Sequence, residues 1–283
     1  MFRLAFMMLF LTLIFVGLGY VIGLMFGAPE SVALFALILA GIMNFIAYFY
    51  SDKIVLSMTR AKIVNEYEYP ILHRIVSKLA ISAGLPKPKV AIINSRIPNA
   101  FATGRNPKNS VVAVTKGLLE ILNEDELEGV ISHELSHIKN RDVLIQSIVA
   151  TIAGAISYLA LIGRYSIFFS DSRNRNTGIL AFLLSLLAPF AALLIQMAIS
   201  RSREYEADKS GAMISKKPLS LASALEKIER FVKSGAMLNI NPSTSPLWIV
   251  NPFRGDSLLE LFSTHPPTWK RIERLKAMAM GVG

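Results

Sequence analysis

The chain has no cysteine among its 283 residues. Disulfide bonds, thiolate metal ligands and cysteine nucleophiles are therefore excluded. Charge is also scarce: 18% of the residues are charged, whereas soluble proteins carry about 25%. Hydrophobic residues make up 53% of the chain, and its mean hydropathy is +0.47. A chain with this balance is expected to contain membrane segments.

Long stretches without any charged residue are the second feature of the sequence. They cover residues 4–26, 31–50, 143–163 and 178–200. Each has about the ~20 residues that a helix needs to cross a ~30 Å hydrocarbon core. The sequence therefore predicts four transmembrane helices, and with them a multi-pass protein whose partner is the lipid bilayer.

Three of these segments have an alternative interpretation. The first could be a cleaved signal peptide, but its apolar stretch exceeds the ~7–15 residues of a signal-peptide core. The second segment also follows it after only residues 27–30, so we expect the first to be retained. Residues 143–163 and 178–200 could instead form a buried hairpin, and the sequence leaves that alternative open.

Acidic residues are fewer than basic ones, 20 against 30, which gives a formal net charge of +10. No nucleic-acid-binding module is recognisable, and no nucleic-acid partner is expected. The basic residues follow or flank the apolar segments instead: Lys53, Arg60, Lys62, Lys139, Arg141, Arg201 and Arg203. This placement favours a cytoplasmic face against anionic lipid headgroups.

A transporter is a rival class of membrane protein. Transporters place ionisable groups inside their spans, and the predicted spans of this chain hold none.

The segments divide the chain into four parts. Residues 1–50 hold the first two spans, residues 143–200 form a transmembrane hairpin, and residues 51–142 and 201–283 are two parts of one polar domain. Within the first polar part, apolar residues repeat along residues 70–83 as on an amphipathic helix.

Short strands and a further helix are predicted after that helix. Residues 89–94 and 110–115 are rich in β-branched side chains, as strands are, and residues 106–109 have the composition of a turn. Asn123 and Glu126 have the spacing of a capping box, so a helix should begin near Glu124. The predicted fold is mainly α, with a small β-sheet.

That helix carries the first chemical motif, the run His133-Glu134-Leu135-Ser136-His137. Side chains at positions i and i+4 lie on one helix face, about 5–6 Å apart between their Cβ atoms, so both imidazoles can reach one metal ion. Glu134 lies beside them, where it can take a proton from a metal-activated water. A zinc site of this kind needs a third protein ligand and an open fourth position.

A later carboxylate is the expected third ligand, because the spacing that would supply a third histidine falls on Val143. Glu204 and Asp208 are spaced i and i+4 on a predicted helix. Glu204 would bind the metal, and Asp208 could hydrogen-bond the free nitrogen of a ligating histidine. Glu206 is the competing ligand, but it points about 200° away from Glu204. A solvated charged helix face is the alternative for the whole cluster.

The sequence resembles the HtpX-type membrane zinc metalloproteases, which are relatives of the CaaX prenyl proteases. The resemblance rests on four blocks in a fixed order: residues 98–119, the His-Glu-x-x-His run, residues 202–208 and residues 264–275. It implies four transmembrane helices and a gluzincin-like α+β zinc protease domain. It also implies one zinc ion per chain, bound by His133, His137 and Glu204, with Glu134 as the base.

The resemblance also implies how the protein would act. Residues 99–104 would form an edge strand that pairs with extended substrate through Asn99, Ala100, Phe101 and Ala102, although an ordinary loop is the alternative. Substrates would be membrane or unfolded polypeptides in the quality control of damaged membrane proteins.

Hydrolysis of a peptide bond by a zinc-activated water passes through a tetrahedral oxyanion. This oxyanion needs a hydrogen-bond donor besides zinc. His265 or Arg271 could serve, although His265 could equally be a helix-start residue before two prolines. We expect the active site to lie at the cytoplasmic surface of the cell membrane, because the ligand-bearing helices directly adjoin the third and fourth spans.

Overall fold

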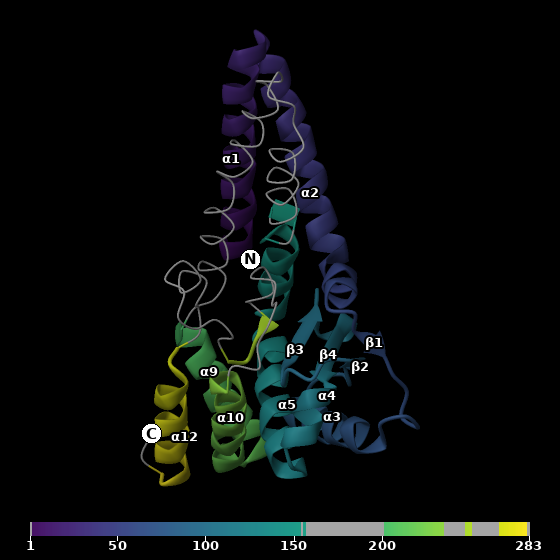
Figure 1. Ribbon diagram of the computed structural model, residues 1–283, viewed down its shortest axis with the longest axis vertical. Coiled ribbons are helices and arrows are strands. Elements are labelled where there is room, and N and C mark those ends of the chain that lie inside the picture. Colours follow the sequence, from purple (N-terminus) through teal and green to yellow (C-terminus); the bar gives the residue numbers. More distant parts are fainter. Residues whose placement is uncertain (1, 154, 157–200, 235–246, 251–265, 282–283) are drawn as a thin grey trace. The chain divides into compact units, whose positions relative to one another are not determined.

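The computed structural model describes residues 2–153, 155–156, 201–234, 247–250 and 266–281 (Figure 1). Two compact units are present, Met1–Ser51 and Asp52–Gly283. The described residues are mainly helical, with one small mixed sheet in the second unit.

The first unit consists of the apolar helix α1 (Phe2–Phe26) and the part up to Ser51 of a second apolar helix, α2 (Pro29–Met58). They meet at Gly27, whose φ of 70° lies in the left-handed region that ends helices. A Cβ on Gly19 would lie 2.6 Å from that of Ala36, so the two helices touch closely there. Asn44 Nδ2 donates to Thr12 Oγ1 at 3.0 Å, which adds a polar contact between the helices.

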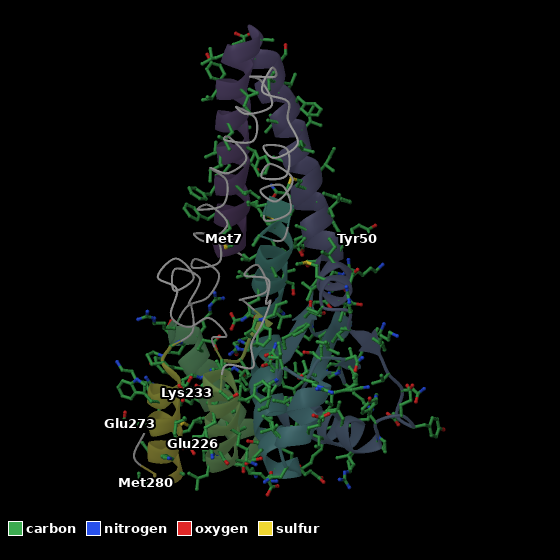
Figure 2. All side chains as sticks on the ribbon, viewed as in Figure 1. Met7, Tyr50, Glu226, Lys233, Glu273 and Met280 are labelled. Atoms are coloured by element: carbon green, nitrogen blue, oxygen red, sulfur yellow. The ribbon has the colours of Figure 1, made fainter. Side chains whose placement is uncertain are left out.

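Both helices are long and apolar enough to cross a membrane, over Ala5–Leu24 and Pro29–Met58. Their outer surfaces carry exposed large apolar side chains such as Leu13 and Phe35. In Figure 2 the side chains of these helices consist mainly of carbon atoms, whereas those of the second unit also show many nitrogen and oxygen atoms. The second helix continues past the predicted end at residue 50, through charged residues, to Met58.

The third predicted span is described only in its first half. An apolar helix covers Val143–Ala153, and its Ile148, Val149 and Ala150 side chains are buried. The remainder of that span from residue 157, and all of the fourth predicted span, lie outside the described residues.

The sheet of the second unit has the order β1-β2-β4-β3. Its strands are β1 (Lys62–Ile63), β2 (Lys89–Ile93), β3 (Ala100–Gly104) and β4 (Ser110–Thr115). β2 and β4 are parallel, and the other two pairs are antiparallel. The strands predicted at residues 89–94 and 110–115 are confirmed, with the 3₁₀ turn Pro107–Asn109 before the second. Among the described strands, β3 lies at the edge of the sheet.

Besides the end of α2 and the apolar helix Val143–Ala153, the second unit contains six described helices. They are α3 (Pro70–Ala83), α4 (Lys116–Ile121), α5 (Glu124–Lys139), α9 (Arg201–Ser215), α10 (Pro218–Lys233) and α12 (Thr268–Ala279). The predicted capping box is present, because the Asn123 side chain accepts from Glu126 N–H while the Glu126 side chain accepts from Asn123 N–H. α5 is central, and its buried residues Val130, Ile131 and Leu135 belong to the main core.

α9 packs directly against α5 at Gly211. A Cβ on this glycine would lie 2.9 Å from the backbone N and Cα atoms of His133. No side chain larger than hydrogen fits there without moving one of the helices. The close contact therefore sets where α9 places its own side chains relative to those of α5.

Candidate metal centre

α5 places both histidines of the motif on one buried face. His133 is 1% exposed and His137 is 4% exposed. Their rings meet edge to face with centroids 4.8 Å apart, and their Nε2 atoms are 3.2 Å apart. The spacing of one helical turn thus brings the two imidazole nitrogens to a single point.

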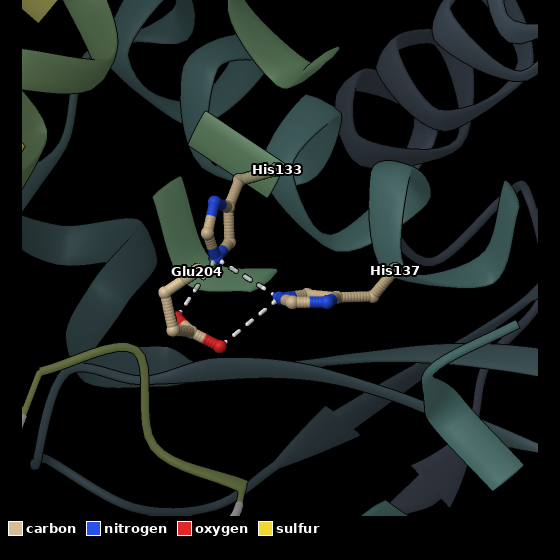
Figure 3. Close-up of side chains that lie close together, drawn as sticks. All are labelled: His133, His137 and Glu204. Carbon is tan, nitrogen blue, oxygen red and sulfur yellow. Dashed lines mark hydrogen bonds and ion pairs between the residues drawn. The ribbon is translucent and has the colours of Figure 1, made fainter. Parts of the chain in front are cut away.

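Glu204 reaches the same point from the first turn of α9 (Figure 3). Its Oε2 lies 3.8 Å from His133 Nε2, and its Oε1 lies 3.6 Å from His137 Nε2. One ligand atom from each of the three residues lies within 4.8 Å of the others. Glu206, the competing carboxylate in the sequence, is exposed on α9.

The donor chemistry of this cluster fits a metal cation. Asp208 Oδ1 lies 3.0 Å from His133 Nδ1, and Asp142 Oδ2 lies 3.5 Å from His137 Nδ1. A carboxylate beside Nδ1 favours the neutral tautomer whose proton is on that atom, which leaves the lone pair on Nε2. The Nε2 lone pairs of the two imidazoles and the Glu204 carboxylate then face one another in a buried space. A bound cation would offset the repulsion between these electron-rich atoms.

Glu134 lies on the same helix as the two histidines and is 5% exposed. Its pKa is raised to about 7, mainly by burial and also by the charge of the nearby Glu204. His137, a hydrogen bond from the Ala102 backbone N–H and Arg271 oppose this rise. A carboxylate of this kind can both accept and return a proton near neutral pH.

A small cavity of about 10 Å³ lies over the cluster, which is about the space that one water molecule needs. Its lining includes the predicted residues Ala100, Phe101, His133, Glu134, His137 and Glu204. It also includes residues that sequence reasoning missed: Gln146, Leu247, Trp248 and Ile249. Gln146 lies in an apolar segment of the sequence, and Leu247, Trp248 and Ile249 belong to no recognised motif, so no spacing signal marked them.

Asp208, the carboxylate predicted to lie next to a proposed histidine ligand, is buried. Its pKa is lowered, because the attraction of Arg271 and of His133 outweighs the opposing effect of burial. Arg271 is 1% exposed and donates to both carboxylate oxygens of Asp208. Its Nη1 also donates to Ile249 O at 2.6 Å. The oxyanion role of Arg271 stays a prediction, and His265 lies outside the described residues.

Asn99 is buried directly before β3, and its side chain forms hydrogen bonds with the segment Leu247–Ile249. Its Nδ2 donates to Leu247 O at 2.9 Å, and its Oδ1 accepts from Ile249 N–H at 3.1 Å. The strand predicted for residues 99–104 is present as β3. Of the four predicted substrate-binding residues, Ala100 and Phe101 line the cavity, Ala102 contacts Glu134, and Asn99 supports the far wall.

Two histidines lie one turn apart on a buried helix, a glutamate directly follows the first of them, and a later helix adds a carboxylate. This arrangement defines a metalloprotease of the His-Glu-x-x-His type. Comparison with known sequences makes the class specific. The chain belongs to peptidase family M48, whose pattern matches residues 66–279.

The relatives confirm the resemblance drawn from the sequence. The chain is 57% identical over 284 residues to a "Protease HtpX homolog" from Pyrococcus furiosus, covering 99% of this chain and 96% of the relative. It is 51% identical over 278 residues to the "Protease HtpX homolog" of Methanocaldococcus jannaschii, with 96% of both chains covered. The chain is therefore an HtpX-type metalloprotease.

A solved structure shares the fold. The crystal structure of S. mikatae Ste24p matches with a TM-score of 0.52 and 20% sequence identity. The match covers 87% of this chain and 59% of Ste24p, so this chain spans less than two thirds of that protein.

Proposed function

We propose that this protease binds one Zn²⁺ through His133, His137 and Glu204 and hydrolyses peptide bonds inside polypeptides. One observation carries the proposal: two imidazole Nε2 atoms and a carboxylate converge within 4.8 Å in a buried space. Two histidines, one carboxylate and an open position make up the ligand set of catalytic zinc.

The residues around the proposed zinc site have different roles in hydrolysis. A zinc ion held by His133, His137 and Glu204 would act as a Lewis acid that polarises the scissile carbonyl and acidifies water. Glu134 takes the proton of the attacking water and delivers it to the leaving amine. The Ala102 N–H holds the Glu134 carboxylate at the edge of β3. Because water is the nucleophile, no covalent acyl-enzyme forms.

The edge of β3 is the proposed binding site for the substrate backbone. Asn99 O accepts from Thr115 N–H at 3.0 Å, so the backbone of Asn99 faces β4. Backbone direction alternates along a strand, and the N–H and C=O groups of Ala100 and Ala102 therefore face the other way. Because the Ala102 N–H is already bonded to Glu134, an extended peptide would pair by β-addition with the Ala100 N–H and C=O groups and the Ala102 C=O, while Phe101 contributes to the cavity wall. Asn99 fixes the opposite wall.

The membrane setting defines the proposed substrates. We propose that residues 143–200 complete four spans in the cell membrane and that the site opens to the cytoplasmic side. The N-terminal helices and the basic residues beside the apolar segments support this arrangement. Substrates would then be membrane proteins or unfolded chains near the bilayer, as in quality control of misfolded membrane proteins.

A cleavage assay on casein tests the zinc requirement. The purified protein in detergent is expected to cleave casein, to lose activity after dialysis against a chelator, and to regain it on addition of Zn²⁺. Metal analysis should find close to one zinc per active chain. Full activity of a preparation that metal analysis shows to be zinc-free would overturn the proposal.

A further inference from the structure

The chain turns sharply after α5, and this turn directs a carboxylate back onto a metal ligand. Arg141 has a φ of 60°, in the left-handed region that non-glycine residues seldom adopt. The next residue, Asp142, then donates its backbone N–H to His137 O at 3.0 Å. Its side chain is buried, and Oδ2 lies 3.5 Å from His137 Nδ1.

A guanidinium group holds this carboxylate from the other side. Arg203 Nη1 donates to Asp142 Oδ1 at 2.8 Å, and the two side chains are 19% and 9% exposed. Attraction to His137 and Arg203 lowers the Asp142 pKa although burial opposes this. Arg203 directly precedes Glu204 on α9. The contact therefore joins the turn after α5 to the turn of α9 that carries the third ligand.

The other histidine has support of the same composition. Behind His133 lies Asp208 at 3.0 Å, and behind Asp208 lies Arg271. Each imidazole thus has a carboxylate at Nδ1 and a guanidinium behind that carboxylate. Partners of this kind fix the tautomer and orientation of a ligating histidine, and their loss typically costs about 10–100-fold in metal affinity or activity.

We propose that Asp142 and Arg203 are positioning residues of the metal centre. Asp142 holds the Nδ1 side of His137, and Arg203 holds Asp142 while it fixes the first turn of α9. The pair thereby sets His137 and Glu204 relative to each other. This inference rests on the proposed zinc site.

Zinc affinity, measured by competition with a chromogenic chelator, tests the pair on the full chain in detergent. Asp142→Asn is expected to bind zinc about 10–100-fold more weakly than the wild type. Arg203→Gln should weaken it in the same direction, and Arg203→Lys, which keeps the charge, should recover part of the loss. Arg201→Gln and Glu206→Gln are matched controls at exposed positions of the same helix and should match the wild type.

A double variant separates positioning from independent damage. If Arg203 acts through Asp142, then Asp142→Asn with Arg203→Gln should bind zinc about as weakly as Asp142→Asn alone. The visible spectrum of the Co²⁺-loaded form should also change in Asp142→Asn and not in Arg201→Gln. Should Asp142→Asn not fold, Arg203→Gln against Arg203→Lys and Arg201→Gln carries the test.

The outcomes distinguish this inference from the proposed function. Wild type that binds no zinc would overturn both. Wild type that binds zinc while Asp142→Asn binds it equally well would overturn only the positioning role. Losses in the double variant that multiply as independent effects would overturn the claim that Arg203 acts through Asp142.

Discussion

Arg271 and Asp208 form a two-point ion pair inside the protein, with Nη2–Oδ1 and Nε–Oδ2 distances of 2.7 and 2.8 Å. Asp208 in turn lies 3.0 Å from His133 Nδ1. The pair joins α12 to α9, and through His133 it reaches α5. A residue near the end of the chain is thereby connected to a proposed metal ligand 138 positions earlier.

The first prediction concerns this pair. Removal of one partner leaves the other charge buried and unpaired, which typically costs about 3–5 kcal/mol. Arg271→Met should therefore lower the unfolding midpoint strongly, because Asp208 loses its cation. The double variant Arg271→Met with Asp208→Asn should lose less. Chemical denaturation in detergent with chelator present measures both, and a double variant that is less stable than Arg271→Met would contradict the explanation.

The second prediction concerns the choice of carboxylate on α9. Glu204→Ala should lose most of its bound zinc, because one of the three proposed protein ligands is gone. Glu206→Ala, which removes an exposed carboxylate two positions later, should keep it. Metal analysis of the two purified variants decides, and the reverse pattern would show that the wrong carboxylate has been assigned.

The third prediction concerns the contact of α9 with α5. Gly211→Ala places a methyl group 2.9 Å from the backbone of His133, so α9 must move and carry Glu204 with it. Overpacking of this kind typically costs about 1–3 kcal/mol, and zinc binding should weaken as well. Gly41→Ala is the control, because a Cβ there meets nothing within 4 Å. Equal zinc content and equal unfolding midpoints in the two variants would refute the packing argument.

The fourth prediction concerns the proposed topology. With four full spans and a cytoplasmic site, residues 164–177 lie outside the cell and the C-terminus inside. A cysteine introduced at Asn174 should then be labelled by a membrane-impermeant thiol reagent in intact cells, and one added at the C-terminus should be protected. The chain has no cysteine of its own to interfere. Protection of both would favour a buried hairpin, and labelling of the C-terminus alone would reverse the orientation.

Local signals in the sequence predicted much of the site. The capping box at Asn123 and the helical spacing of His133 and His137 depend only on neighbouring residues, and both appear in the structure. β1 was missed, because it has two residues and both are exposed.

Contacts between distant segments were harder to predict. Asp142 lies behind His137 only because Arg141 adopts a left-handed conformation, and no apolar period signals such a turn. The burial of Arg271 depends on the meeting of α12 and α9, which are more than fifty residues apart in sequence.

The most direct measurement compares Glu134→Gln with the wild type for casein cleavage and zinc content together. An amide cannot accept the proton of the attacking water, yet it leaves the three proposed ligands in place. Glu134→Gln is therefore expected to keep its zinc and to lose nearly all turnover. Glu120→Gln, at an exposed position of α4, should retain both. Proteolysis by zinc-loaded Glu134→Gln at a rate near that of the wild type would contradict the account.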